Sequence, residues 1–393
     1  MTERADVVDW ALVRSAEKLV PLLRENAAEA ERLNRLPTAN VEALERVGLT
    51  RLTTPKRLGG LQANGPTEFE VARTLARGCG STSWVVSLYA LCGFWASLFP
   101  DSTQEEVFTG PGARVAGIST PAGTLVQVEG GYVLNGEWPW NTGVLDATWN
   151  VLATLRPGDD GGMTPYLALV PVDELSLLDD WRMSGMKGTG SVTSVARDVF
   201  VPAARAMPFV PLLSGEHASH ANRGVVEYSY AVYPFLLAAS AGTLVGMAQG
   251  ALESFADRAG QRATSFEDMG RQSVSPVAKF QVGEIAMQIE SALALGRQAM
   301  ASLHQHAVQG SAMPVEERLR LRAVVAYVTR LSADAATALS RIGGATAFRP
   351  DILGQREERN AAMLSNHALL NYEANLSVFG ALKLGNDPQT VFL

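Results

Sequence analysis

Apolar residues recur at helical spacing near both ends of the chain, whereas shorter alternating runs occupy its middle. Near the amino terminus, Pro66 marks a helix start and apolar residues follow it at intervals of three. A second buried helix is predicted from one apolar stripe: Trp84, Leu88, Leu91, Trp95 and Leu98. Residues 1–111 are therefore predicted to form an α-helical domain.

The pattern changes near the Gly110-Pro111-Gly112 turn. The segment TLVQVEGGYVLNG alternates apolar and polar residues about Gly130 and Gly131, which is typical of a β-hairpin. Further short apolar runs, bounded by Gly, Pro and Asp, predict strands at 149–155, 165–171 and 194–202. Residues 112–211 are therefore predicted to form a central β domain, a sandwich or barrel.

Long helical patterns return in the last part of the chain. Four amphipathic segments with short connections predict an antiparallel four-helix bundle over residues 212–393. Its expected helices lie at 227–260, 274–309, 315–342 and 353–383. The predicted fold class is α+β, mostly α, in the order helical domain, β domain and bundle.

One stretch of the bundle, residues 231–250, carries no charge over the length of a membrane span. It contains Gly242, Gly246 and Gly250 at a four-residue spacing that lets helices approach closely. As a lone span with Pro234 near its start, it is better interpreted as a buried helix at the bundle centre or at a subunit contact. We expect a homo-tetramer or homo-dimer and no membrane insertion.

Composition excludes several classes of protein. The 393 residues are 47% hydrophobic with a net charge of −7, which indicates a folded chain and argues against a nucleic-acid partner. Cys79 and Cys92 suggest neither a disulfide framework nor a metal site, and the charged amino terminus does not resemble a signal peptide. We expect a cytoplasmic protein without bound metal. No phosphate loop, HExxH or G-x-S-x-G motif is present.

Of the five histidines, only His367 occurs in an apolar pattern, in the segment SNHALLNYEA. On a continuous helix it would share a face with Met363, Leu364 and Leu370. Such a histidine is either a core residue with a satisfied hydrogen bond or a catalytic imidazole in an apolar site. The segment by itself leaves both interpretations open.

Two further segments carry candidate chemistry. EWPWNTG, residues 137–143, places two tryptophans beside amide and hydroxyl groups, which would suit a planar heteroaromatic ligand or would simply fill a core. GMKGTGS, residues 185–191, is a glycine-rich loop with hydroxyls, and alone it indicates a turn as readily as a ligand cradle.

Taken together and in order, these segments resemble the acyl-CoA dehydrogenase superfold and, within it, the two-component (group D) flavin monooxygenases. The resemblance spans nearly the whole chain. It is carried by ARGCGSTSWVVSLYA, GEWPWNTG (similar to W-P-F-x-S-G), GMKGTGSVTSVARDVFVP, GMAQGALESFADRAGQRATSF and RNAAMLSNHA. It implies the oxygenase component of a monooxygenase that uses reduced flavin (FADH2 or FMNH2) and O2 through a flavin hydroperoxide. The sequence contains no nicotinamide-binding fingerprint, so a separate NAD(P)H-flavin reductase is expected.

The resemblance also implies roles for individual residues. His367 would stand close to the oxygen adduct as a proton donor, and Thr142 would lie beside the reactive edge of the flavin where the family usually has serine. Arg262 and Phe266 would reach the flavin phosphates from a neighbouring subunit. The implied cofactor-binding set is Trp140, Asn141, Thr142, Gly143, Ser191, Arg262, Phe266, Gly343, Gly344 and Arg359. The implied substrate pocket contains Trp84, Tyr89, Cys92 and Phe94.

Departures from the family pattern shape the expected chemistry. Cys92 occupies the position of a second histidine that assists phenol deprotonation in related hydroxylases, so an electron-rich ring such as an indole or polyketide aromatic is favoured. Asn360 replaces the usual aspartate after Arg359. Alternatives are an N-oxygenase of amines or amino sugars, a scaffold that has lost its cofactor, and an acyl-CoA dehydrogenase. The dehydrogenase is disfavoured because its base position falls near Ala368, with Glu373 further on.

Overall fold

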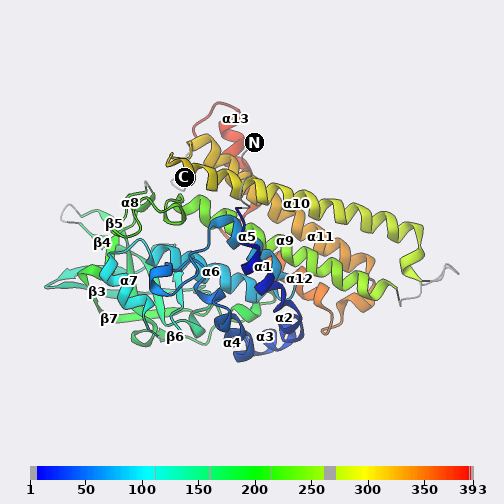
Figure 1. The fold of residues 1–393 in the computed structure, drawn as a ribbon, viewed down its shortest axis with the longest axis horizontal. Coiled ribbons are helices and arrows are strands. Elements are labelled where there is room, and N and C mark those ends of the chain that lie inside the picture. The colour runs from blue at the N-terminus through cyan, green and yellow to red at the C-terminus, as the bar shows by residue number, and fades with distance from the viewer. Residues whose placement is uncertain are drawn as a thin grey trace.

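The computed structural model describes residues 7–110, 112–158, 161–213, 215–260, 271–388 and 390. A β-sheet lies at one end of the molecule, and the long helices of the carboxyl-terminal part extend away from it (Figure 1). Helices that precede the sheet in sequence pack between the sheet and this bundle (Figure 1). The predicted fold class is confirmed.

The amino-terminal part is helical, as predicted. Its α-helices are α1 (Trp10–Glu17), α2 (Val20–Glu25), α3 (Ala27–Leu33), α4 (Thr38–Arg46), α5 (Gly65–Ala76), α6 (Gly80–Ala96) and α7 (Asp101–Phe108). The α5 helix begins where Pro66 predicted a start, because the Asn64 side chain accepts a hydrogen bond from the Thr67 N–H at 3.0 Å. Sixteen of the 17 residues of α6 are buried, so this helix lies inside the molecule.

The central part forms one eight-stranded sheet. Its strands are β1 (Val115–Ile118), β2 (Thr124–Val128), β3 (Gly131–Trp138), β4 (Trp149–Pro157), β5 (Met163–Pro171), β6 (Ser176–Leu177), β7 (Ser194–Pro202) and β8 (Ala206–Pro208). The strand order is β6-β7-β3-β2-β4-β5-β8, with β1 parallel to β4. The β2–β3 hairpin pairs Val128 with Gly131, which confirms the predicted turn. The short strands β1, β6 and β8 were not predicted, because so few residues carry no recognisable alternation.

The carboxyl-terminal bundle contains α8 (Val210–Leu213), α9 (Val232–Ala259), α10 (Pro276–Gln309), α11 (Val315–Ile342), α12 (Leu353–Leu364) and α13 (Tyr372–Lys383). The prediction of one helix over 353–383 is wrong, because a turn separates α12 from α13. In this turn the His367 N–H donates to the Leu364 carbonyl at 2.9 Å, and Asn371 caps α13 by accepting from the Ala374 N–H at 2.9 Å. His367 therefore lies in a turn and not on an apolar helical face.

The α9 helix lies at the centre of the bundle. Among the described residues it is the one helix long and apolar enough to cross a membrane, and 89% of its most apolar window is buried inside the protein. Its glycines allow close contact with α5, since a Cβ at Gly246 would lie 2.1 Å from the Arg73 carbonyl oxygen. The lack of charge over residues 231–250 is therefore explained by burial within a single chain.

Candidate active site

The turn after β3 separates two tryptophans with opposite environments. Trp138 is fully buried in the sheet, whereas Trp140 is 56% exposed. Trp140 has a φ of 67°, which is unusual for a bulky residue and is a form of backbone strain found at functional sites. Its ring packs edge-on against Trp181, with 5.5 Å between centroids. The turn thus presents a large aromatic face to its surroundings.

The next three residues are held tightly against the sheet and α6. Asn141 donates from its backbone N–H to the Val192 carbonyl at 3.2 Å and from Nδ2 to the Ser194 hydroxyl at 2.7 Å. Its Oδ1 is buried with no hydrogen-bond partner among the described residues. Gly143 has a φ of 73°, and a Cβ there would lie 2.9 Å from the Val85 side chain. Only glycine fits this position without displacing α6.

A chain of hydroxyl groups connects this turn with the 185–191 loop. The Thr142 and Ser191 hydroxyls are 2.9 Å apart, and the Ser191 and Thr189 hydroxyls are 2.7 Å apart. Thr189 donates to the Met186 carbonyl at 2.8 Å. Thr142 and Ser191 were predicted site residues, whereas Thr189 was not, although its hydroxyl is visible in the GMKGTGS segment.

His367 lies in the turn between α12 and α13, beside α6. Its side chain is exposed, yet the protein around it lowers the pKa of the imidazole through desolvation. Its ring packs edge-on against Trp84, with 5.8 Å between centroids. The Leu369 N–H donates to its Nδ1 at 3.3 Å. In the neutral imidazole Nδ1 is thus the acceptor, so Nε2 carries the proton and is the donor.

Helix α6 links the turn after β3 with His367. The Tyr89 hydroxyl donates to the Gly143 carbonyl at 2.6 Å, and Trp84, five residues earlier on the same helix, contacts His367. Five residues of α-helix span about 7.5 Å along the axis and turn by about 140°, so the two contacts leave different faces of α6. Helix α6 thus contacts both the predicted flavin-facing turn and the ring of the predicted proton donor.

The other two residues of the predicted substrate pocket lie in the core. Cys92 is fully buried, and a Cβ at Gly117 of β1 would lie 3.0 Å from its Sγ. Burial raises the pKa of the Cys92 thiol far above its usual range, so the thiol stays protonated. Phe94 is also fully buried and packs edge-on against Phe235 at 5.1 Å. Like Trp84 at 6% and Tyr89 at 3% exposure, neither side chain reaches solvent.

Arg359 braces the loop that carries the hydroxyl chain. Its guanidinium pairs with Glu31 and donates to the Ser184 carbonyl, and it also bonds the Gln355 side chain at 2.9 Å. A Cβ at the adjacent Gly185 would lie 2.3 Å from the Arg359 carbonyl oxygen. Arg359 was predicted to contact the cofactor, and within this chain its side chain supports this loop.

The remaining predicted cofactor residues belong to another part of the bundle. Gly343 and Gly344 directly follow α11. Arg262 and Phe266 lie outside the described residues.

A buried polar pair that the sequence analysis did not select anchors the same loop to α12. The Met186 N–H donates to Asn360 Oδ1 at 2.6 Å, and Asn360 Nδ2 donates to the Glu357 carboxylate at 3.1 Å. Glu357 also accepts from the Gly80 N–H at the start of α6, at 3.2 Å. Burial raises the pKa of Glu357 to about 7. Asn360, noted only as a departure from the family pattern, thus joins the loop to a buried carboxyl.

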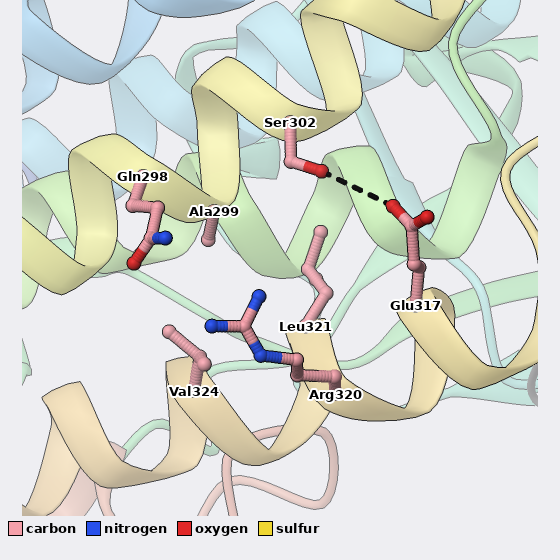
Figure 2. A pocket seen from close by; sticks show the side chains of 7 residues that line it. All are labelled: Gln298, Ala299, Ser302, Glu317, Arg320, Leu321 and Val324. Carbon is pink, nitrogen blue, oxygen red and sulfur yellow. Dashed lines mark hydrogen bonds between the residues drawn. The ribbon is translucent and has the colours of Figure 1, made fainter.

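Of two cavities, one is remote from the turn after β3, and the other borders this turn through Trp181 and Val192. A cavity of about 30 Å³ between α10 and α11 has room for little more than water, and Ser302 and Glu317 form a 3.4 Å hydrogen bond across it (Figure 2). A pocket of about 440 Å³ lies beside Trp181, but its two arginines, Arg35 and Arg182, already pair with aspartates. Among the described residues, no cluster of His, Cys, Asp and Glu could hold a metal ion.

Comparisons with known proteins give matches over most of the chain. Residues 12–106 match the acyl-CoA dehydrogenase N-terminal domain, and residues 238–372 match the acyl-CoA dehydrogenase C-terminal domain. The chain is 31% identical to the flavin-dependent monooxygenase oxygenase subunit HsaA of Mycobacterium tuberculosis, over 96% of each chain. It is 28% identical to the oxygenase component of the FADH2-dependent resorcinol hydroxylase of Rhizobium sp., over 96% and 95% of the two chains.

A solved structure gives the same result. XiaF from Streptomyces sp., in complex with FADH2 and glycerol, superposes with a TM-score of 0.91 at 32% identity. The match covers 98% of this chain and 97% of XiaF.

Proposed function

Because the chain belongs to the acyl-CoA dehydrogenase family and, within it, to the oxygenase subunits of flavin-dependent monooxygenases, we propose that it hydroxylates an electron-rich aromatic substrate with reduced flavin and O2. One observation carries this proposal. Helix α6 holds the Thr142 turn through Tyr89 and contacts His367 through Trp84. Helix α6 would in this way couple the position of a flat cofactor at the turn to that of the neutral imidazole.

The residues of the turn fit a flavin ring. Trp140 offers an exposed aromatic face, and the Thr142 and Ser191 hydroxyls offer hydrogen bonds beside it. Bound reduced flavin supplies the electrons that activate O2 for transfer of one oxygen atom to the substrate. FADH2 is the proposed form, since FADH2 is the flavin in the descriptions of XiaF and the resorcinol hydroxylase, at 32% and 28% identity.

His367 is the proposed proton donor. The neutral imidazole of His367 carries its proton on Nε2, and the indole of Trp84 shields one side of the ring from water. An apolar site with one such donor protects oxygen transfer from hydrolysis and supplies the proton that oxygen transfer requires. Acyl-CoA dehydrogenase activity lacks support because that reaction needs a carboxylate base. Position 368 is alanine, and Glu373 is an exposed residue in the first turn of α13.

The substrate class follows from the residues near the proton donor. Cys92 is buried and stays protonated, so it offers no base for removing a phenolic proton. An aromatic ring that is already electron-rich, such as an indole or a polyketide aromatic, reacts without that deprotonation. Such a substrate would pack against Trp84, whose ring already contacts His367.

We expect the purified protein to form no product with NADH, O2 and an aromatic substrate alone, because the sequence has no nicotinamide-binding fingerprint. FADH2 prepared anaerobically and then mixed with O2 and substrate should restore hydroxylation, which mass spectrometry of the products detects. A separate reductase would supply FADH2 in the cell, and the cytoplasm provides its NAD(P)H. Turnover with NADH alone would disprove this dependence.

A homo-oligomer is the second part of the proposal. Helix α10 exposes apolar side chains on one face, with Phe280 at 71% and Met287 at 65% exposure. Isolated chains rarely leave such residues in water on one helix face. We therefore assign this α10 face to a subunit contact.

Light scattering should report a dimer or tetramer at micromolar concentration, and the double substitution Phe280→Glu with Met287→Glu should shift it towards monomer. Phe200→Glu is the matched control, because Phe200 is 49% exposed on β7 and lies outside this contact. A monomeric wild-type protein, or an oligomer unaffected by the double substitution, would refute the assignment.

A further inference from the structure

The hydroxyl chain at the candidate site has a defined direction. The Met186 carbonyl can only accept, so the Thr189 hydroxyl commits its single proton to it at 2.8 Å. Thr189 must then accept from Ser191 at 2.7 Å, and Ser191 must accept from Thr142 at 2.9 Å. Each hydroxyl has one proton to give. Thr142 is therefore left with oxygen lone pairs and no proton for a ligand.

The Met186 carbonyl, which sets this direction, is held in place by neighbouring residues. Met186 has a φ of 49°, its N–H donates to Asn360 at 2.6 Å, and its carbonyl also accepts from the Trp181 indole at 3.3 Å. Asn360 is in turn held by Glu357. The Met186 carbonyl also accepts from the backbone N–H of Thr189 at 3.1 Å, and this bond together with the Trp181 indole keeps the carbonyl aimed at Thr189.

We infer that Thr189 is a specificity residue that makes the site select reduced over oxidised flavin. This inference rests on the proposed position of the flavin edge beside Thr142. Reduced flavin carries a hydrogen on N5 and can donate to the Thr142 oxygen. Oxidised flavin has a lone pair on N5, and two facing acceptors repel each other. Thr189 itself would act through Ser191 and Thr142 without touching the flavin.

Thr189→Val removes the group that orients the chain. Ser191 can then donate to Thr142, and Thr142 can donate to N5 of oxidised flavin. We expect the ratio of the dissociation constant for oxidised FAD to that for reduced FAD to fall about tenfold. The fall should come mainly from tighter binding of oxidised FAD, because one hydrogen bond replaces two facing acceptors. The measurement is titration of each variant with oxidised FAD in air and with FADH2 under anaerobic conditions, followed by the flavin spectrum.

Three variants separate orientation from simple loss of packing. Ser191→Ala breaks the same chain at its middle and should lower the ratio in the same direction. Thr189→Ser keeps the hydroxyl and should retain the wild-type ratio. Thr154→Val is a matched control on β4, because its hydroxyl is buried without a partner among the described residues.

The possible outcomes are distinct. Equal weakening of both flavin forms by Thr189→Val, or an unchanged ratio in both Thr189→Val and Ser191→Ala, would overturn the role of Thr189 while leaving the proposed function intact. If Thr189→Val does not fold, Ser191→Ala alone decides between these results. A wild-type protein that binds neither form of FAD would overturn the proposed function together with this inference.

Discussion

His367→Ala is expected to lower product formation by about 10²- to 10⁴-fold, the usual effect of losing a general acid or base. Oxygen consumption should continue, with hydrogen peroxide released in place of the hydroxylated product. The reason is that Nε2–H of His367 is the donor that faces the proposed site, beside Trp84. The measurement is the ratio of product to peroxide for each FADH2 oxidised.

The same substitution should have little effect on stability. His367 is exposed in a turn, and its side chain accepts one hydrogen bond, from the Leu369 N–H. Its removal is therefore expected to cost within about 1 kcal/mol of unfolding free energy. His306→Ala is a suitable control, since His306 is a half-buried imidazole on α10 that pairs with Glu317 at 3.0 Å. A His367→Ala protein that keeps the wild-type product-to-peroxide ratio would show that the residue is structural.

Glu68→Gln is expected to stabilise the protein at alkaline pH and to flatten the dependence of its stability on pH. Glu68 is buried on α5, and neither of its carboxyl oxygens has a hydrogen-bond partner among the described residues. Burial raises its pKa from 4.5 to about 8, and the nearby Ser87 hydroxyl offsets this only in part. The folded protein therefore holds a proton on Glu68 that the unfolded chain has released.

The sign of the effect follows from this difference in bound protons. Between pH 4.5 and about 8 the folded state binds more protons than the unfolded state, so unfolding free energy falls as pH rises through that window. The total loss is about 3 to 5 kcal/mol for a shift of this size. Glutamine has no proton to lose, so the variant should lack this loss. Burial raises the pKa of Glu357 to about 7, so Glu357 also makes stability fall with rising pH, by a smaller amount. This smaller dependence should remain in the Glu68→Gln variant.

Urea unfolding at a series of pH values from 5 to 9 measures this slope. Glu70→Gln is the matched control, two residues away on the same helix. Burial acts to raise the pKa of Glu70, but ion pairs with Arg297 and Arg73 outweigh it and hold the pKa below its usual value. Glu70→Gln should thus destabilise the protein by a constant amount over that range and leave the slope unchanged. Equal slopes for wild type and Glu68→Gln would contradict the assignment.

The local pattern of the chain was sufficient for most of the secondary structure. Pro66 and the apolar spacing after it predicted the start of α5, and the Gly130-Gly131 pair predicted the β2–β3 hairpin. The charge-free composition of 231–250 predicted a buried helix, which is α9. These features follow from the sequence because periodicity and turn residues act within a few positions of one another.

Local pattern failed where competing hydrogen bonds decided the conformation. The apolar spacing around His367 suits a continuous helix, yet the chain turns there and Asn371 starts a new helix. Helical spacing does not report whether a side chain will cap a backbone N–H instead of facing solvent. The sequence therefore identified His367 as a candidate residue but placed it on the wrong kind of element.

By itself the sequence determined the order of helical and β segments, the apolar core helices, and the candidate residues Thr142, Ser191 and His367. The tertiary structure alone decided how these residues are connected. The contact of Met186 with Asn360 joins positions 174 residues apart, and the hydroxyl contact of Thr142 with Ser191 joins positions 49 residues apart. Burial of Glu68 without a partner likewise depends on how the helices pack. Such long-range contacts leave no period in the sequence, because each depends on packing between segments that are distant along the chain.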